Sequence, residues 1–219
     1  VAALAGELPG ALVLPCDATD AAAIAQARDR LAADWGGIDL AIYLAGDYTP
    51  MRAWEYAPDA AAHMIAVNFT GALSFAAALT PQLMRQGAGQ IAFVSSVAGY
   101  RGLPKALVYG PTKAALINLA ETLWLDLAPR GIGVRLINPG FVATPLTAQN
   151  DFAMPALITP DEAAREILRG FATDAFENGE ITWLRSHICL PSNSEAWTAE
   201  REAYDTNWLA LTREPANTW

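Results

Sequence analysis

The sequence predicts a doubly wound α/β protein, in which helices cover both faces of a parallel sheet to form three layers, α/β/α. Hydrophobic residues make up 53% of the chain and charged residues only 17%, an excess that is typical of strands buried on both faces. Short apolar runs alternate with longer helical segments, as in repeated βαβ units. With 219 residues, the chain is long enough for one such domain with a sizeable core.

Strand and helix signals alternate along most of the chain. Apolar runs without polar alternation predict strands, while capping residues and glycines mark the helix ends. Thr19 or Asp20 caps the first complete helix, and Gly36-Gly37 ends it. Pro111 falls in the first turn of a later helix, where a missing N–H costs nothing. In chain order we predict the end of a helix at Val1–Leu8, strand Ala11–Pro15, helix Asp20–Trp35, strand Ile38–Leu44, helix Asp59–Arg85 with a bend near Pro81, strand Gln90–Ser95, helix Tyr109–Leu127, strand Ile132–Asn138, a helix from Thr159 or Asp161 to Phe171, and strand Glu180–Leu184.

Composition excludes several classes of protein. The net charge is −9, from 14 basic and 23 acidic residues, and there is no basic block, which disfavours binding to nucleic acid or to an anionic membrane surface. No apolar run approaches the roughly 20 residues that span a bilayer. Two cysteines, Cys16 and Cys189, form no disulfide framework, so we expect a reducing, cytoplasmic location. With two histidines and no ligand spacing, no metal site is predicted.

Three side chains in the centre of the chain are placed for proton transfer. Tyr109 and Lys113 are four residues apart on a predicted helix and therefore share one face. An ammonium beside a phenol favours phenolate, so Lys113 is expected to lower the pKa of Tyr109 from about 10. Ser96 follows the carboxyl end of a strand, where open α/β sheets bind ligands. Its hydroxyl would donate to a substrate oxygen while Tyr109 exchanges the proton.

Six motifs in this order and spacing resemble those of a short-chain dehydrogenase/reductase of the single-domain type, over about residues 1–175. The resemblance implies a Rossmann-like fold, and hydride transfer between NAD or NADP and a carbonyl or secondary alcohol substrate. The motifs are Asp17 after a strand, Tyr43-Leu44-Ala45-Gly46, Asn68 in VNFTG, Ser95-Ser96, Tyr109-Gly-Pro-Thr-Lys113, and Pro139-Gly140-Phe-Val-Ala-Thr144.

The same resemblance implies a role for each matching residue. Tyr109 would be the general acid/base, Ser96 would polarise the carbonyl, and Lys113 would lower the pKa of Tyr109 and hold the nicotinamide ribose. Asn68 is similar to the family residue that holds a water in the proton relay to Lys113. The cofactor contacts implied are Asp17 with the adenine, Ala45 and Gly46 with the adenosine side, and Pro139, Gly140, Val142 and Thr144 with the nicotinamide.

Simpler roles remain open for several of these residues. Asn68 could be a helix polar residue that is satisfied by backbone, Asp17 a turn or cap residue, and Thr144 an ordinary loop hydroxyl. Pro139-Gly140 would form a turn with or without a ligand. Bulky loop residues could wall a pocket for an apolar substrate or instead belong to the core or to a dimer contact: Tyr48, Met51, Trp54, Tyr100, Phe141, Leu146, Phe152 and Met154.

The glycine-rich turn that holds the cofactor's pyrophosphate in this family does not occur in the sequence. Without two further strands, the strand at Ala11–Pro15 has no neighbour and that at Ile38–Leu44 exposes an apolar edge. We therefore expect about 35–40 residues, close to the length of a βαβ unit, to precede Val1. The alternative function is a non-catalytic binding or oligomerisation module that lacks the phosphate-binding loop.

The domain organisation that we expect is a cofactor-binding domain over residues 1–185 and a segment of unclear structure over 186–219, with one plausible helix at Ser194–Leu211. By resemblance, the protein is expected to form a homodimer or homotetramer through the helices that begin at Asp59 and Tyr109, because both are apolar around much of their circumference.

Overall fold

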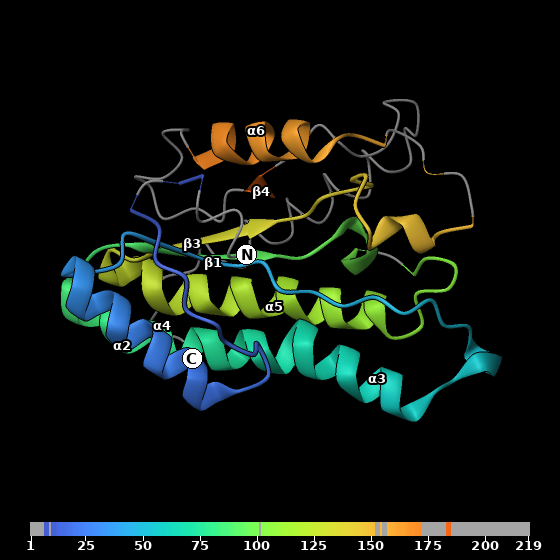
Figure 1. Cartoon of the computed structure of the whole chain (residues 1–219), viewed down its shortest axis with the longest axis horizontal. Helices are drawn as coiled ribbons and strands as arrows, with labels where there is room; N and C mark the ends of the chain where they lie inside the picture. The colour runs from blue at the N-terminus through green and yellow to red at the C-terminus, as the bar shows by residue number, and fades with distance from the viewer. Residues whose placement is uncertain are drawn as a thin grey trace, which may run out of the picture.

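A parallel sheet forms the centre of the computed structural model, which describes residues 7–8, 10–100, 102–151, 154, 157–171 and 183–184. Its strands lie in chain order, and every pair is parallel (Figure 1). The predicted doubly wound α/β class is therefore confirmed. The strands are β1 (Leu40–Tyr43), β2 (Gln90–Val94), β3 (Gly133–Ile137) and β4 (Trp183–Leu184).

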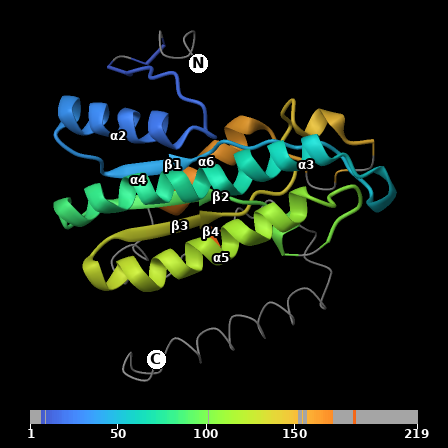
Figure 2. The same ribbon diagram turned by 90° about the horizontal axis from the view of Figure 1, so that it is seen from below.

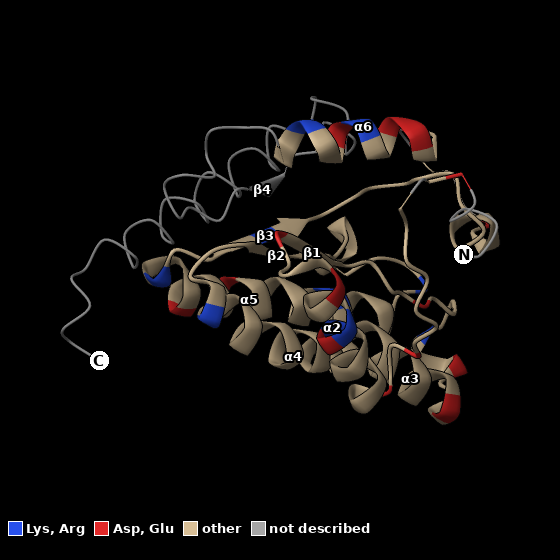
Figure 3. Cartoon of the chain, turned by 60° about the vertical axis from the view of Figure 1, so that its left-hand side comes forward, with Lys and Arg blue, Asp and Glu red and all other residues tan. Residues whose placement is uncertain are grey.

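Helices cover both faces of this sheet. Helix α6 (Pro160–Phe171) lies over one face, and α2 (Ala21–Trp35), α4 (Gly71–Gln86) and α5 (Tyr109–Leu127) lie side by side over the other (Figures 1 and 2). The main core is the apolar layer between the sheet and these three helices, and a smaller cluster packs under α6. Charged residues run along α6, whereas α4 is almost free of them in Figure 3, as expected for a helix with a large buried face.

The first complete helix begins and ends as capping chemistry requires. The Asp20 carboxylate accepts hydrogen bonds from the N–H groups of Ala22 and Ala23, which decides between the two predicted caps. Gly36 ends the helix in the left-handed conformation, with φ of 77°. Thr19 instead donates to Asp17 through its N–H and its hydroxyl. Helices α5 and α6 also lie at the predicted positions.

The long helix predicted for Asp59–Arg85 is irregular at a different place from the one expected. It consists of α3 (Pro58–Ile65), a π-helical turn η2 (Ala66–Thr70) and α4, and Pro81 lies inside α4. A π-helical turn is rare and is often found at functional sites. Here it carries Asn68, whose side chain is buried.

By length and composition, Pro58–Gln86 is apolar enough to cross a membrane, contrary to the expectation that no such run exists. In the fold, however, its buried residues pack in the two apolar clusters: Ala61, Met64, Ala72, Ala76, Leu79 and Leu83. These contacts are those of a core helix in an α/β layer.

The predicted strand at Ala11–Pro15 is wrong, because residues 11–15 form no strand. A strand is stable only when its N–H and C=O groups pair with a neighbour. Among the described strands, β1 lies at the edge of the sheet and pairs with β2 only. Residues 1–6, the predicted helix at Ser194–Leu211 and the segment 186–219 lie outside the described residues.

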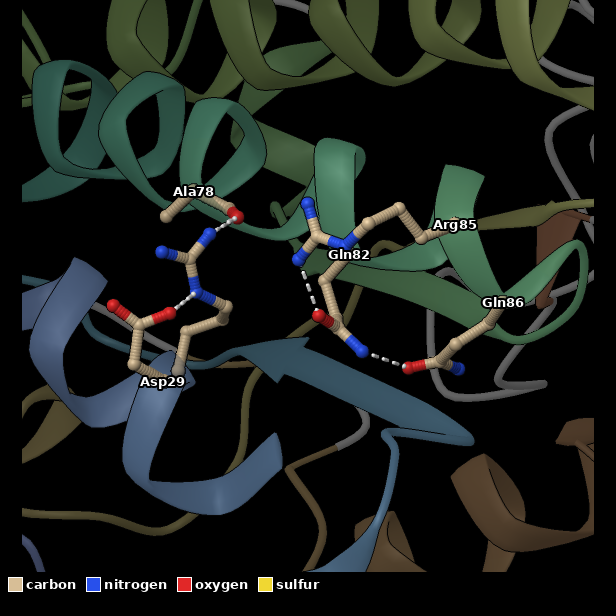
Figure 4. A network of polar contacts seen from close by, with 6 residues as sticks. Asp29, Ala78, Gln82, Arg85 and Gln86 are labelled. Atoms are coloured by element: carbon tan, nitrogen blue, oxygen red, sulfur yellow. Dashed lines mark hydrogen bonds and ion pairs between the residues drawn. The ribbon is translucent and has the colours of Figure 1, made fainter. Parts of the chain in front are cut away.

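Polar side chains attach α2 to α4 (Figure 4), and Gln86 of α4 also binds the segment just before β1. The Gln86 amide accepts from the N–H of Ile38 at 3.0 Å and donates to its carbonyl at 2.9 Å, as a neighbouring strand would. Gln82 donates to Gln86. Arg28 donates to the Ala78 carbonyl at 2.7 Å and pairs with Asp29. These bonds hold the sheet edge and the helical layer in one position.

Gly71 lies where the segment before α2, strand β1 and helix α4 meet. A Cβ atom on Gly71 would lie 2.3 Å from the Ala18 carbonyl oxygen and 2.4 Å from the Tyr43 hydroxyl. That hydroxyl donates to the Val67 carbonyl in the π-helical turn at 2.6 Å. Close approach of backbone and side chain therefore requires glycine at this position.

We predict that Gly71→Ala lowers the free energy of unfolding by about 1–3 kcal/mol, the usual cost of overpacking. Alanine is about 1 kcal/mol better than glycine in a helix, but the backbone clash outweighs that gain. Urea denaturation measures the change. Gly102→Ala is the matched control, because a Cβ there meets nothing within 4 Å. Equal stability of the two variants would contradict the packing described.

Candidate active site

A cavity opens at the carboxyl ends of the strands, where the loops after β2 and β3 meet the start of α5. It encloses about 500 Å³, including its open mouth. Ser96 follows β2, Gly140 follows β3, and Tyr109 is the first residue of α5. The described residues that line the cavity are Tyr48, Ser96, Val97, Ala98, Leu103, Pro104, Ala106, Tyr109, Gly140, Phe141, Leu146, Thr147 and Asn150.

Ser96 and Tyr109 face each other across the floor of this cavity. Ser96 caps a short 3-10 turn, η3 (Val97–Gly99), and its Oγ accepts from the N–H of Ala98 at 3.1 Å. Burial raises the pKa of Tyr109 above its usual value, and a hydrogen bond with Ser96 acts in the opposite direction. The two hydroxyls are therefore close enough to act on one substrate oxygen.

Lys113 lies one turn further along α5 and is almost completely buried, with 4% of its surface exposed. Its Nζ donates to the Val94 carbonyl at the end of β2 at 2.9 Å and lies 5.5 Å from the centre of the Tyr109 ring. Ser95 donates to the Lys113 carbonyl at 2.7 Å. Burial lowers the pKa of Lys113 to about 8, because a charged amine loses hydration in the interior.

The net pKa of Tyr109 is not lowered, contrary to the expectation from the sequence. Burial dominates at Tyr109 and raises its pKa, and the hydrogen bond that lowers it comes from Ser96. The ammonium lies over the ring of Tyr109 and is hydrogen-bonded to the Val94 carbonyl. Spacing along a helix thus predicts that Tyr109 and Lys113 share a face, but it does not predict that the Lys113 ammonium donates to the Val94 carbonyl.

Asn68 joins the loop after β1 to helix α5. Its Oδ1 accepts from the N–H of Asp47 at 2.7 Å, and its Nδ2 donates to the Asp47 carbonyl at 2.9 Å and to Thr112 Oγ1 at 3.1 Å. Thr112 in turn donates to the Tyr109 carbonyl. The side chain is thus satisfied largely by backbone, as the simpler interpretation requires, and it also lies beside the catalytic candidates.

The residues implied as cofactor contacts fall into two groups. Gly46 lies with the candidates above, since a Cβ there would be 3.7 Å from Lys113 Nζ and 3.8 Å from Asn68 Oδ1. Ala45 packs against the main core, and Gly140 lines the cavity. The Pro139 carbonyl accepts from Val97.

The second group is engaged in local turns. Asp17 is exposed, and its carboxylate accepts two hydrogen bonds from Thr19, both at 2.8 Å. The N–H of Thr144 donates to the Thr147 hydroxyl at 3.0 Å, and that hydroxyl donates to the Val142 carbonyl. Val142 also forms a bridge with Ile158.

The groups present fit the ribose end of a nicotinamide cofactor. An ammonium carries three N–H donors, and Lys113 uses one on Val94, so its others can serve ribose hydroxyls. Asn138, at the end of β3, has a buried Oδ1 without a hydrogen-bond partner beside Pro139-Gly140. The glycine-rich turn for the pyrophosphate is not among these 219 residues.

The predicted pocket walls are correct for Tyr48, Phe141 and Leu146, which line the cavity. The other bulky loop residues lie elsewhere. Met51 packs in a small cluster with Ala61, Met64 and Val108. Trp54 is 77% exposed, and Tyr100 is exposed as well. Met154 accepts a hydrogen bond from Asn150, and Phe152 lies outside the described residues.

Several residues that build the site had no role assigned from the sequence. Ser95 and Thr112 belong to two of the motifs, and their position directly before Ser96 and Lys113 was the available signal. Lys105 forms an ion pair with Asp151. Its backbone is left-handed, with φ of 60°, and its carbonyl accepts from Met51 at 2.8 Å. Contacts between distant loops leave no periodic pattern in a sequence.

Comparisons with known proteins agree with this fold. A family model described as short chain dehydrogenase matches residues 1–154. An uncharacterized oxidoreductase of Myxococcus xanthus is 36% identical over 164 residues, covering 73% of this chain and 65% of the relative. A second, from Staphylococcus aureus, is 29% identical over 171 residues, covering 78% and 74%.

Solved structures are similar as well. A NAD⁺-bound xylitol dehydrogenase is 34% identical with a TM-score of 0.59, covering 64% of this chain and 55% of that one. A short-chain dehydrogenase from Streptomyces avermitilis has a TM-score of 0.71 at 23% identity, covering 97% and 84%, and supports the fold. The matched region spans less than two thirds of the Myxococcus relative and of the xylitol dehydrogenase. The extent of the family match nevertheless shows that this chain belongs to the short chain dehydrogenase family.

Proposed function

We propose that the protein is an oxidoreductase that transfers hydride between NAD or NADP and a carbonyl or secondary alcohol substrate. The observation that carries this proposal is the convergence of Ser96 and Tyr109 on one cavity, with the buried Lys113 behind them. Such a cavity at the carboxyl ends of parallel strands is where α/β proteins bind ligands. The name of the xylitol dehydrogenase neighbour, a NAD⁺-bound protein, supports the cofactor class.

In the reductive direction, Tyr109 acts as a general acid. The Tyr109 phenol donates its proton to the carbonyl oxygen, while the Ser96 hydroxyl donates a hydrogen bond to the same oxygen. A nicotinamide held beside Lys113 would supply the hydride that the carbonyl carbon needs to become an alcohol carbon. In the oxidative direction, the Tyr109 phenolate takes the hydroxyl proton back.

Lys113 and Asn68 assist this proton transfer without lining the cavity. The Lys113 ammonium, held by the Val94 carbonyl, stabilises negative charge that develops on Tyr109. Asn68 fixes the loop after β1 against α5 through Asp47 and Thr112. We propose that the relay water implied by the family resemblance lies between these two side chains and Gly46.

The substrate that we propose is neutral and largely apolar. None of the described residues lining the cavity carries a charge, and most contribute aliphatic or aromatic surface. Lys105, which lies between the lining residues Pro104 and Ala106 in sequence, is paired with Asp151. An anionic substrate would be desolvated here without a counter-charge, which is costly.

A homodimer or homotetramer through α4 and α5 is a further part of the proposal. Leu73 and Met84 of α4 and Leu125 of α5 are large apolar side chains that remain 40–49% exposed. Exposed apolar surface on adjacent helices favours self-association. Light scattering after size-exclusion chromatography measures the oligomeric state, and a monomer at micromolar concentration would contradict this part.

We predict that Tyr109→Phe lowers kcat by at least about a hundredfold, because the proton donor is lost, while NAD(P)H binding is retained. Reduction of carbonyl compounds, followed by NAD(P)H absorbance, measures turnover, and NAD(P)H fluorescence measures binding. Tyr56→Phe is the control, since Tyr56 is 59% exposed and does not line the cavity. Near-normal activity of Tyr109→Phe would refute the assignment, whereas an absence of NAD(P)H binding in the parent protein would favour a non-catalytic module.

We also predict a pH-dependent effect of Lys113→Met on stability. The folded pKa of Lys113, about 8, lies below its ordinary value of about 10.4. Between these pH values the unfolded chain binds more protons, so this group increases stability as pH rises. The methionine variant should therefore be more stable than the parent near pH 7, and its advantage should shrink toward pH 10.

Urea denaturation at several pH values measures this difference. Titrations shared by both proteins, such as that of Tyr43, whose pKa burial raises to about 12, cancel in the comparison. A difference that stays constant over the pH range would show that Lys113 is not desolvated.

A further prediction concerns substrate charge. Cyclohexanone and acetophenone, which are neutral, should be reduced with a kcat/KM at least about tenfold above that for pyruvate, because the desolvation of a carboxylate is uncompensated in the cavity. A preference for pyruvate would exclude the neutral substrate class while leaving the proton-transfer assignment intact.

A further inference from the structure

Tyr48 packs its ring against the ring of Tyr109. The two ring centroids are 5.0 Å apart with an interplanar angle of 67°, an edge-to-face contact. Tyr48 comes from the loop after β1, far from Tyr109 in sequence, and only 8% of its surface is exposed. Both rings line the candidate substrate cavity.

The loop that carries Tyr48 is fixed on three sides. Asn68 binds the backbone of the preceding residue, Asp47, through both its N–H and its carbonyl. The Tyr48 carbonyl accepts from Gln149 Nε2 at 3.3 Å, which ties it to the loop after β3. Met51 donates to the Lys105 carbonyl at 2.8 Å and accepts from the N–H of Leu107 at 3.2 Å. Because these contacts fix the loop, the Tyr48 ring has a fixed position against the Tyr109 ring.

Four residues around Tyr109 come from three places in the fold. Ser96 faces the phenol from just before η3, and Tyr48 faces it from the loop after β1. Lys113 and Thr112 lie on α5 with Tyr109, and Thr112 donates to the Tyr109 backbone carbonyl. Asp151 is the charged group that acts on Tyr48. The Lys113 ammonium lies over the Tyr109 ring, and the Tyr48 ring packs against it in an edge-to-face contact. The bulk of the Tyr48 ring limits both the rotation and the hydration of the phenol.

We propose that Tyr48 is a positioning residue: its ring, held by the Asn68–Asp47 and Gln149 contacts, orients the Tyr109 phenol toward Ser96 and excludes water from it. This inference rests on the proposed function, in which Tyr109 transfers the proton. Burial is the main cause of the raised pKa of Tyr109, and like-charge repulsion from the Tyr48 hydroxyl is a smaller one. By keeping the phenol buried, the Tyr48 ring extends the pH range over which Tyr109 stays protonated.

The test compares Tyr48→Phe, which keeps the ring, with Tyr48→Leu, which keeps bulk but removes the ring. The ionisation of Tyr109 is read directly from tyrosinate absorbance, as the difference between each variant and the same variant carrying Tyr109→Phe. Opening the phenol to water should lower the pKa of Tyr109 by at least about half a unit in Tyr48→Leu. Tyr48→Phe should stay closer to the parent protein.

Kinetics with cyclohexanone supply the second readout. Loss of orientation should lower kcat of Tyr48→Leu roughly tenfold to a hundredfold, more than KM changes, and Tyr48→Phe should lose less than Tyr48→Leu. A rise in KM with an unchanged Tyr109 titration would show that Tyr48 only lines the cavity and would overturn the proposal. Equal losses of kcat in both variants would also overturn it, because the Tyr48 hydroxyl would then act on the substrate.

The titration separates this proposal from the proposed function. If the parent protein shows no turnover but Tyr48→Leu still lowers the pKa of Tyr109, the positioning contact stands and the reaction assignment fails. If Tyr48→Leu does not fold, as judged by circular dichroism, Tyr48→Met takes its place, since methionine fills irregular apolar space.

Discussion

The burial of one ammonium group constrains much of this structure. Lys113 is 4% exposed and needs a partner, because an unpaired charge in the interior is strongly destabilising. The Val94 carbonyl provides that partner only if α5 lies directly over the end of β2. Gly99 permits this approach, since a Cβ there would lie 2.8 Å from the Lys113 backbone. The hydrogen bond of the Lys113 ammonium thus sets the distance between helix α5 and the end of strand β2.

A second constraint comes from the π-helical turn before α4. It carries Asn68, which binds both backbone groups of Asp47 and reaches Thr112 on α5. Tyr43 at the end of β1 donates to the Val67 carbonyl in the same turn. Strand β1, the π-helical turn and helix α5 are therefore joined through this one turn. An irregular turn in the helix directs its polar side chain to a place that a regular helix would not reach.

The sequence predicted the regular parts well, because they depend on local chemistry. Caps such as Asp20 and Gly36, and the apolar runs of β2 and β3, act on their own neighbours. The strand at Ala11–Pro15 failed because a strand depends on a partner elsewhere in the chain. The bend expected at Pro81 was displaced to Ala66–Thr70, where tertiary contacts of Asn68 and Tyr43 decide the geometry. Similarly, the shared face of Tyr109 and Lys113 was predictable, but the Val94 bond and the Tyr48 ring contact were not.

Burial shifts the pKa values of Tyr109 and Lys113 in opposite directions, and in both cases it favours the neutral form of the group. It raises the pKa of Tyr109 and lowers that of Lys113 to about 8, because both charged forms lose hydration. Near neutral pH the phenol therefore holds its proton, which is the form that carbonyl reduction needs. A folded pKa of about 8 still leaves Lys113 mostly charged there, so a phenolate that forms in the transition state meets a cation. The two shifted pKa values thus share one main cause, the burial of both groups.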